Sequence, residues 1–348
     1  MIRFPGKLTA ATFLARFWQK APLFIPGGIE QLRPTISRNE LAWLATLDDV
    51  ESRIVFTDRT DDLIRYRVES GPFDTEYLQT LPKRDWSLLV HDVDKHLPAM
   101  RRLFDLVPFV PDWRIDDLMI SFAAGGGGVG PHKDDYDVFL CQGIGLRDWR
   151  FSTETIEEDP AASDELMLLR EFNHGDRQEA RKGDVLYLPP GVAHWGTARK
   201  ACLTYSIGMR APSFYADPDL ELSEVRPGYI SHAARKRAGA EAAALGRIVT
   251  ELKHWLQPEA PSERDIGQLL QNSSALPRLR MHGMARIAYD DETLYVNGAD
   301  RPLKASELGA VASLCTRRKL DRCIMGGLDN ASLRWLIAQG AFEQTAQD

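Results

Sequence analysis

Short apolar runs separated by glycine, proline and aspartate fill residues 118–209, and this spacing constrains the fold more than any other feature. Runs of this length with turn residues between them are typical of strands in a small antiparallel barrel or sandwich. We expect strands over residues 118–123, 137–142, 149–152, 184–188 and 202–208. The acidic stretch 156–179 predicts a loop with a short helix over residues 164–171.

The segment before this β-rich region predicts both helices and strands. Residues 12–20 have a helical pattern that ends before Pro22. Ser37 and Glu40 have the spacing of a capping box and predict the start of a second helix. Further strands are expected over residues 53–56, 64–68 and 86–90.

The chain changes character after about residue 225. Residues 231–256 are rich in Ala, Lys, Arg, Glu and Leu and predict one or two helices. Beyond them we expect strands over 285–290 and 293–297 and helices over 306–316 and 330–339, in a small winged-helix-like module. The proposed boundaries are 1–225 (core 85–215), 226–260 and 261–348, which suits a chain of 348 residues.

Charge and composition narrow the classes of function. The formal charge of −7 argues against a nucleic-acid-binding protein. Residues 226–348 carry 17 basic and 14 acidic residues, which leaves −10 on residues 1–225. Since no run approaches 18 apolar residues and the start lacks the apolar segment of a signal peptide, we expect no membrane span. Four cysteines form no disulfide framework, so a cytoplasmic location is expected.

Two motifs in the β-rich region carry the chemistry. The glycine-rich turn at residues 125–130 leads into His132-Lys133-Asp134, and on a strand residues i and i+2 face the same side. About sixty residues later, an apolar run ends in a Pro-Pro-Gly turn and is followed by His194. The spacing predicts that His132, Asp134 and His194 hold one metal ion.

Two histidines and one carboxylate form the facial triad of non-haem Fe(II) oxygenases, which leaves metal positions open for other ligands. A hydrolytic zinc site uses the same ligand types, so the triad leaves a cupin-like metal hydrolase or a sugar-binding barrel as an alternative. The remaining histidines lack paired ligands at useful spacing and are expected to be structural or exposed.

The pattern around the first motif is recognisable. Residues 131–149, with Pro131, His132, Asp134, Tyr136 and Trp149 in place, resemble the JmjC-type 2-oxoglutarate oxygenases, and more closely their bacterial ribosomal oxygenases. Residues 13–26 (FLARFWQKAPLFIP) and 112–122 (DWRIDDLMISF) are similar to the same family. The resemblance extends over the whole chain and is weakest after about residue 225.

The resemblance implies a mainly β protein with some helices, built on a double-stranded β-helix of the cupin or JmjC type. It also implies Fe(II) held by the triad, with 2-oxoglutarate and O2 as cosubstrates. Arg147 matches the family's position for the 2-oxoglutarate carboxylate, and its planar fork suits a carboxylate. Ser121 is a candidate hydroxyl partner, with Thr204 and Ser206 as weaker ones.

The resemblance further implies hydroxylation of an arginine on a large-subunit ribosomal protein. The acidic charge of residues 1–225 suits such a basic partner. Asp135, Tyr136 and Asp137 follow the metal motif, and a carboxylate with an aromatic face suits an arginine. Two alternatives remain: a JmjC hydroxylase with a histidine or other protein target, and a non-catalytic ribosome-binding module.

The family also has a helical dimerisation segment before a winged-helix-like end, so a homodimer through residues 226–260 is expected. The basic run at residues 317–319 is interpreted as a solvated surface. We therefore expect no direct nucleic-acid chemistry, and contact with a ribonucleoprotein only through its protein component.

Overall fold

The computed structural model describes residues 1–60, 63–209, 228–232, 235, 244–252, 260–271 and 279–344. The chain divides into two compact units. Unit 1 comprises residues 1–107 and 115–219, and unit 2 comprises residues 108–114 and 220–348. Much of the predicted helical stretch 231–256 lies outside the described residues, which include only α6 (Leu245–Thr250) as a continuous helix there.

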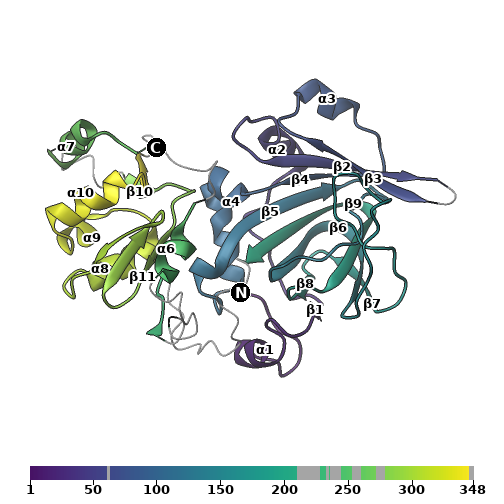
Figure 1. Ribbon diagram of the computed structural model, residues 1–348, viewed down its shortest axis with the longest axis horizontal. Helices are drawn as coiled ribbons and strands as arrows, with labels where there is room; N and C mark the ends of the chain where they lie inside the picture. Colours follow the sequence, from purple (N-terminus) through teal and green to yellow (C-terminus); the bar gives the residue numbers. More distant parts are fainter. Residues whose placement is uncertain are drawn as a thin grey trace. The chain divides into compact units, whose positions relative to one another are not determined.

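Unit 1 is built on one nine-stranded antiparallel sheet with the order β1-β8-β6-β9-β5-β4-β2-β3, and β7 pairs with β6 (Figure 1). Its strands are β1 (Leu23–Ile25), β2 (Ser52–Arg59), β3 (Ile64–Ser70), β4 (Trp86–Val90), β5 (Ile115–Ala123), β6 (Val138–Ser152), β7 (Asp176–Arg181), β8 (Val185–Leu188) and β9 (Ala193–Met209). The expectation of a mainly β, antiparallel unit is confirmed.

The longest strands, β6 and β9, pair along most of their length. The sequence predicted two short strands where β6 is a single one, because Gly143 and Gly145 were interpreted as turn residues. Gly145 has a φ of +75°, and the pairing with β9 shifts register between Gln142 and Arg147. The glycines therefore mark bulges inside a continuous strand, as glycine often does in sheets.

Those register shifts decide which side chains face the interior of the unit. Val138 and Leu140, before the bulges, line a central cavity, and so do Arg147 and Trp149 after them. Strict alternation would place residues 148 and 150 on that face instead. The bulges therefore change the alternation of β6.

The opposite face of the sheet is covered by the N-terminal segment. The helix α1 (Ala10–Arg16) brings Phe13 to within 5.7 Å of Phe139 and 4.8 Å of Tyr187, measured between ring centroids. This helix ends earlier than the predicted residue 20. The capping box is confirmed: the Ser37 side chain caps α2 (Arg38–Leu44) and the Glu40 side chain binds the backbone of Ser37.

The remaining helices of unit 1 are short: α3 (Thr75–Thr80), α4 (Val93–His96) and the 3-10 helix η1 (Pro98–Leu106). The predicted helix over residues 164–171 is wrong. An isolated bridge joins Glu158 to Leu169, the Asp159 N–H donates to the Leu168 carbonyl at 2.7 Å, and residues 164–166 form bends, so the stretch is not helical. Pairing with another segment outweighed the local helical preference. The strand β7 was also missed, since it had been included in the loop.

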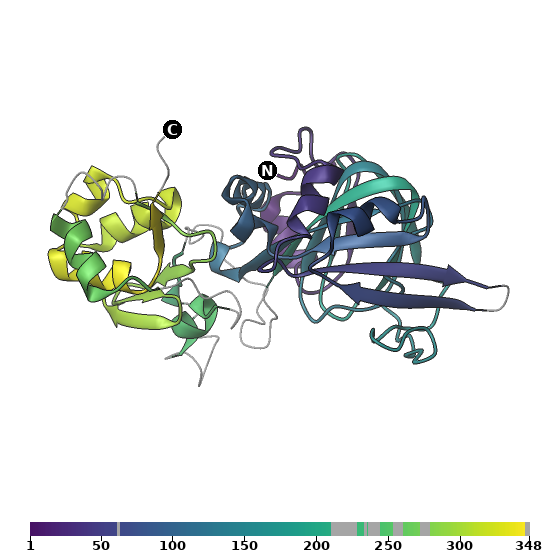
Figure 2. The ribbon, with the colours of Figure 1, turned by 90° about the horizontal axis from the view of Figure 1, so that it is seen from above.

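Unit 2 combines small sheets with helices (Figure 2). Strands β11 (Ile287–Tyr289), β12 (Thr293–Val296) and β13 (Ala299–Pro302) form one antiparallel sheet, and β10 (Leu279–Met281) pairs with β14 (Phe342–Gln344). Its other helices are η2 (Asp112–Arg114), α7 (Glu263–Gln271), α8 (Leu308–Arg317), α9 (Arg322–Gly326) and α10 (Asn330–Ala338).

The core of unit 2 joins the three-stranded sheet to α8 and α10 through Leu294, Val311, Leu314 and Leu336, all fully buried. The two predicted strands and two predicted helices of this region are present, and no end differs by more than two residues. Among the described residues, no helix has both the length and the apolar composition that a membrane crossing requires.

Candidate metal centre and pocket

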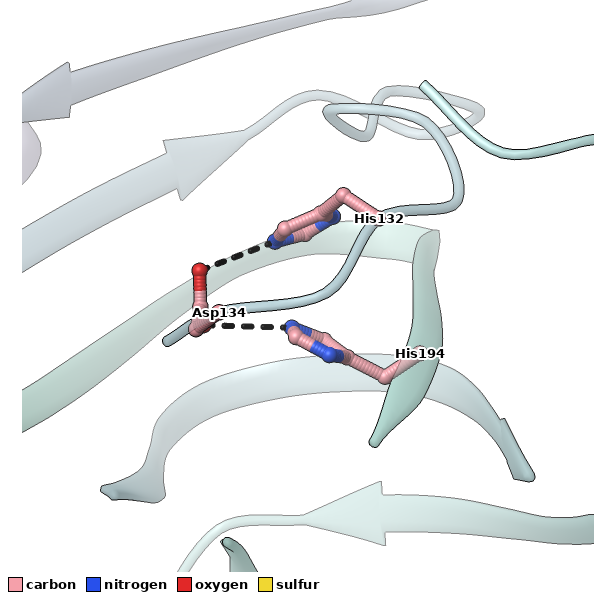
Figure 3. Close-up of side chains that lie close together, drawn as sticks. All are labelled: His132, Asp134 and His194. Atoms are coloured by element: carbon pink, nitrogen blue, oxygen red, sulfur yellow. Dashed lines mark ion pairs between the residues drawn. The ribbon is translucent and has the colours of Figure 1, made fainter. Parts of the chain in front are cut away.

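His132, Asp134 and His194 meet in unit 1, although two separate segments supply them (Figure 3). His132 and His194 form an isolated antiparallel bridge, in which each backbone N–H donates to the other residue's carbonyl at 2.9 and 2.8 Å. Directly opposed residues project to the same face, so their rings lie 4.1 Å apart between centroids. The Asp134 carboxylate lies 3.9 Å from Nε2 of His132 and 3.6 Å from Nε2 of His194.

The predicted regular strand beginning at His132 is wrong, since β6 begins only at Val138 and Asp134 lies on an irregular segment. That segment is held by the Pro-Pro-Gly turn: the Gly191 N–H donates to the Asp134 carbonyl at 2.7 Å. Gly191 adopts a φ of +77°, a conformation that suits glycine. The turn therefore positions Asp134 as well as leading to His194.

The hydrogen bonds of the two histidines fix their tautomers. Nδ1 of His132 lies 3.0 Å from the Gly130 carbonyl, and Nδ1 of His194 lies 3.0 Å from the Val192 carbonyl. A carbonyl oxygen can only accept, so each Nδ1 carries a proton, and in the neutral ring the lone pair is on Nε2. Both lone pairs are directed toward Asp134. This is the arrangement by which proteins orient histidine ligands of metals.

Burial keeps His194 neutral at physiological pH. The side chain is almost fully buried. Desolvation, followed by the nearby His132, lowers the pKa of His194 to about 4. A neutral imidazole is the form that binds a metal, so the site favours the ligand state without needing a base to remove a proton.

A cavity of about 220 Å³ opens beside the three ligands. Its lining comes from β2, β4, β5, β6 and β9 and from the segments at residues 129–136 and 166–168. On β5, alternation places Asp117, Met119 and Ser121 on the cavity side. Of the residues at the opening, Lys133, Tyr136 and Met167 are exposed.

Arg147 lies in this cavity and is only 4% exposed. One of its terminal nitrogens donates to Thr204 at 3.1 Å and to Ser121 at 3.4 Å, and its guanidinium lies 5.0 Å from the centroid of the Trp149 ring. The buried Nε has no hydrogen-bond partner, and no carboxylate among the described residues forms an ion pair with it. Burial lowers the pKa of Arg147, yet a guanidinium remains charged in proteins.

The hydroxyl groups predicted to assist Arg147 are brought together with it. Thr204, which had been ranked below Ser121, lies closer to the guanidinium and donates its own proton to Gln142 at 3.2 Å. Thr204 can therefore accept from Arg147 while its hydrogen is already used. Ser206 lines the cavity as well but makes no hydrogen bond with Arg147 among the described residues.

The structure places the three predicted substrate residues in different environments. Tyr136 lines the cavity and is 38% exposed, and the burial of its hydroxyl raises its pKa. Asp135 is exposed and does not line the cavity. The expectation that Asp137 faces the site is wrong: it is fully buried, and its carboxylate accepts from the Tyr187 hydroxyl and from Gln19. Asp137 anchors the N-terminal segment to the sheet.

Asp117 is the site residue that the sequence analysis missed. Its carboxylate lines the cavity, and the nearest basic side chain described is His91, whose Nδ1 lies 3.8 Å away. No hydrogen-bond donor among the described residues binds this carboxylate. In a strand, residues 117, 119 and 121 face the same side, so Ser121 indicates position 117 as well. Position 117 lies one residue before the predicted strand 118–123.

The cavity fits a metal ion and a dicarboxylate. The ligand atoms of His132, Asp134 and His194 all lie within 4.8 Å of one another. A buried guanidinium without a carboxylate partner is costly unless an anion completes it, and Arg147 supplies such a cation in the same cavity. The fold and the site together define a metal-dependent oxygenase of the facial-triad class.

Comparisons with known proteins agree with this class. Residues 102–216 match the model of the JmjC domain. The chain is 33% identical over 339 residues to the "Ribosomal protein uL16 3-hydroxylase" of Escherichia coli K12, covering 86% of this chain and 88% of the relative. The match shows family membership, because both proteins are covered almost completely.

Solved structures give the same result. The X-ray structure of E. coli YcfD has a TM-score of 0.77 and 28% identity, and the match covers 98% of this chain and 100% of that one. The E. coli ribosomal oxygenase YcfD in complex with cobalt and 2-oxoglutarate has a TM-score of 0.73 and 28% identity, with coverages of 98% and 99%. The chain belongs to the JmjC-domain family of ribosomal oxygenases.

Proposed function

We propose that this protein is an Fe(II)- and 2-oxoglutarate-dependent hydroxylase of an arginine side chain on a large-subunit ribosomal protein. The observation that carries the proposal is Arg147, a buried cation without a carboxylate partner in the cavity of the His132, Asp134 and His194 cluster. One E. coli relative is named for uL16, and the solved E. coli ribosomal oxygenase YcfD is in complex with cobalt and 2-oxoglutarate.

In this proposal His132, Asp134 and His194 hold the iron, with both imidazoles fixed by their Nδ1 hydrogen bonds. Three protein ligands on one face leave the other metal positions open to small ligands. When bound, iron and 2-oxoglutarate supply the oxidising power that hydroxylates an unactivated C–H bond with O2. The protein's part is to bind, to orient and to keep competing groups away.

Arg147 is proposed to bind the carboxylate of 2-oxoglutarate that lies farther from the metal. The guanidinium has donors left over after its bonds to Thr204 and Ser121, and its place beside Trp149 holds the plane of the fork. An anion there would be desolvated and bound by charge-assisted hydrogen bonds. This accounts for a buried arginine in the cavity that forms no ion pair with a carboxylate among the described residues.

Asp117 favours a cationic target. Its carboxylate faces the cavity without a donor that satisfies it, so a guanidinium in the cavity would gain both an ion pair and hydrogen bonds. Tyr136 lies at the opening, where its ring can pack along the target side chain. A neutral histidine would leave the Asp117 charge uncompensated, which favours arginine as the target.

The net charge supports a basic protein partner. Residues 1–225 carry a formal charge of −10, which attracts a positively charged polypeptide and raises the rate of encounter. Free amino acids would gain less from this field, since the attraction grows with the charge of the partner. A ribosomal protein fits that description.

The test is direct. The full-length protein with Fe(II), 2-oxoglutarate and arginine-containing peptides that cover uL16 should produce succinate and one peptide heavier by about 16 Da, the mass of one oxygen atom that hydroxylation adds. His132→Ala should abolish turnover and metal binding, measured by succinate release and by the absorption of bound Co(II). His174→Ala removes an exposed histidine outside the cavity and should change neither. Turnover that survives His132→Ala, or a product in which a histidine carries the oxygen, contradicts the proposal.

We also propose the organisation expected from the sequence: an oxygenase domain over 1–225, a helical dimerisation segment over 226–260 and a winged-helix-like domain over 261–348. The alanine-rich composition of residues 231–256 supports the helical segment. A homodimer in the cytoplasm, where ribosomal proteins are made, follows from this organisation. Light scattering of the full-length protein at micromolar concentration should give twice the mass of the 39.2 kDa chain.

A further inference from the structure

Arg53 is a second arginine in the cavity, and the metal and cosubstrate sites do not use it. It lies on β2, opposite Leu89 of β4, and Leu89 lies opposite Ser121 of β5. Arg53, Leu89 and Ser121 all line the cavity, so they belong to one row across its face. Arg53 is thus two strands away from the strand that carries Ser121 and Asp117, or about 10 Å across the sheet.

The side chain of Arg53 has no acceptor among the described residues. Its Nε is buried and has no hydrogen-bond partner, and no carboxylate among the described residues forms an ion pair with it. The other arginines of β2 and β3 differ in this respect: Arg59 pairs with Asp85, Arg65 with Asp164 and Arg67 with Glu69. A buried donor that faces a cavity is satisfied when a ligand brings an acceptor.

We propose that Arg53 donates hydrogen bonds to main-chain carbonyl oxygens of the polypeptide substrate and so anchors its backbone at the cavity. This assignment rests on the proposed function, because it needs a polypeptide in the same cavity. Arg53 then determines affinity for the protein substrate, while Asp117 binds the target side chain.

The chemistry of the substrate selects carbonyl oxygens as the acceptors. A basic polypeptide has few carboxylates to offer, whereas each residue carries one main-chain carbonyl with two lone pairs. The positive charge of Arg53 repels a guanidinium, and the negative charge of Asp117 attracts it. The two residues therefore fix the direction in which an arginine side chain enters.

The positions of Asp117 and Arg53 allow one substrate residue to bind both of them. Asp117 and Arg53 are on different strands, with Leu89 and His91 of the β4 region between them in the cavity wall. Arg53, Asp117 and Tyr136 all line this cavity, so the two charges and the Tyr136 ring border the same space. In the proposed complex, an extended arginine side chain binds Asp117 through its guanidinium, and its backbone lies away from that carboxylate and within reach of Arg53.

The experiment compares two probes on full-length variants loaded with Co(II) and 2-oxoglutarate. The first probe is the uL16 peptide that the wild-type enzyme hydroxylates, and the second is n-butylguanidine, which has a guanidinium but no main-chain carbonyl. Arg53→Gln should weaken peptide binding by about 10- to 100-fold, the effect of losing hydrogen bonds from a charged donor. Binding of n-butylguanidine, measured by calorimetry, should change less than about twofold, since no bond is lost.

Three further variants separate the role of Arg53 from that of Asp117. Asp117→Asn should weaken both probes, and Arg53→Lys should recover part of the peptide affinity because an ammonium still donates. Arg181→Gln makes the same change in net charge at an exposed position of β7 and should leave both affinities unchanged. With Fe(II), Arg53→Gln should raise the KM for the peptide and leave the KM for 2-oxoglutarate at its wild-type value.

Equal binding of the peptide to Arg53→Gln and to wild type overturns the assignment of Arg53. So does an equal loss for both probes, which would place Arg53 at the side-chain subsite. Failure of the wild-type enzyme to hydroxylate any uL16 peptide is a different result, since it contradicts the proposed function itself.

Discussion

Each histidine of the metal cluster uses one ring nitrogen for support and the other for binding. The Gly130 and Val192 carbonyls accept from the two Nδ1 atoms, at 3.0 Å in both cases. Both acceptors lie two residues before the histidine that they orient. Each ligand is therefore positioned by its own local backbone, and the bridge between His132 and His194 then sets the two rings side by side.

The buried charge of Arg147 predicts how tightly the protein binds 2-oxoglutarate. Arg147→Gln should raise the KM for 2-oxoglutarate by about 100-fold, because a buried carboxylate would lose its counter-charge. Binding of Co(II) alone should be unchanged, since Arg147 is not a ligand. Calorimetric titration of the Co(II)-loaded protein with 2-oxoglutarate measures the effect.

Arg150→Gln is the matched control, because Arg150 lies on the same strand but donates to Asn173 outside the cavity. It should bind 2-oxoglutarate as tightly as the wild type does. An Arg147→Gln variant with wild-type 2-oxoglutarate affinity would show that another cation binds the cosubstrate.

The burial of His96 predicts how the stability of the protein changes with pH. Its side chain is 6% exposed, and burial lowers its pKa, so the folded state favours the neutral ring. An unfolded histidine has a pKa of about 6.5, so the unfolded state binds the proton more readily. The free energy of unfolding should therefore decrease as the pH falls below about 6.5, toward the lower pKa of the folded state.

Urea unfolding at pH 7.5 and pH 5.5 measures this loss. His96→Phe, which cannot titrate, should show a smaller difference between the two pH values than the wild type. His174→Phe alters an exposed histidine and should keep the wild-type difference. If His96→Phe and the wild type lose equal stability, other groups cause the acid sensitivity.

At the scale of elements, the glycine-rich turn that precedes the metal ligands is closely packed at one position and open at another. A Cβ on Gly127 would lie 2.1 Å from the Trp86 carbonyl oxygen, whereas a Cβ on Gly125 would meet nothing closer than 3.6 Å. Of these two positions, only Gly127 requires the absence of a side chain. The turn is therefore held against the end of β4 by a backbone contact.

Gly127→Ala should destabilise the protein by at least about 2 kcal/mol, because a backbone atom cannot move aside as a flexible side chain can. Gly125→Ala is the matched control and should cost less than about 1 kcal/mol. Chemical denaturation of both variants measures the difference. Equal stabilities would mean that the turn relaxes freely.

The elements also show what the sequence could and could not predict. The metal ligands followed from two local motifs, and β4 was predicted with its exact ends, because its apolar run has turn residues on both sides. The continuity of β6 could not be predicted, since the bulges at Gly143 and Gly145 depend on pairing with β9. Arg147 faces the cavity only because of those bulges.

Asp117 and Asp137 also show that the local sequence does not decide which side chain faces the cavity. Both are aspartates beside apolar runs, and local pattern alone does not distinguish them. The Asp137 carboxylate accepts hydrogen bonds from the Tyr187 hydroxyl and from Gln19 and so lies outside the cavity. Both donors come from distant parts of the chain. Asp117 remains in the cavity because the residues around it offer no such donors. Tertiary partners decide the role of each carboxylate.

At the scale of the whole molecule, every residue that lines the cavity belongs to unit 1. A ligand that binds the folded state stabilises the unit that it contacts, by about 2.7 kcal/mol at a hundred times its Kd. We expect Co(II) with 2-oxoglutarate to slow amide hydrogen exchange in β5, β6 and β9 of unit 1. Exchange in β11, β12 and β13 of unit 2 should stay the same.

Hydrogen exchange with mass spectrometry measures both sets of strands in one experiment. The variant Arg147→Gln serves as the control, because Co(II) remains bound while the effect of 2-oxoglutarate should be lost. Equal protection of unit 2 would mean that binding in the cavity is coupled to the second unit.

The division into units has a consequence for the order in which the chain becomes ordered during synthesis. The last strand of the large sheet ends at Met209, whereas the short segment 108–114 belongs with residues made after position 219. Trp113 donates its Nε1–H to the Tyr229 carbonyl at 2.9 Å, an acceptor that emerges more than a hundred residues later. During synthesis, all strands of the large sheet therefore leave the ribosome before the residue that accepts the hydrogen bond of Trp113.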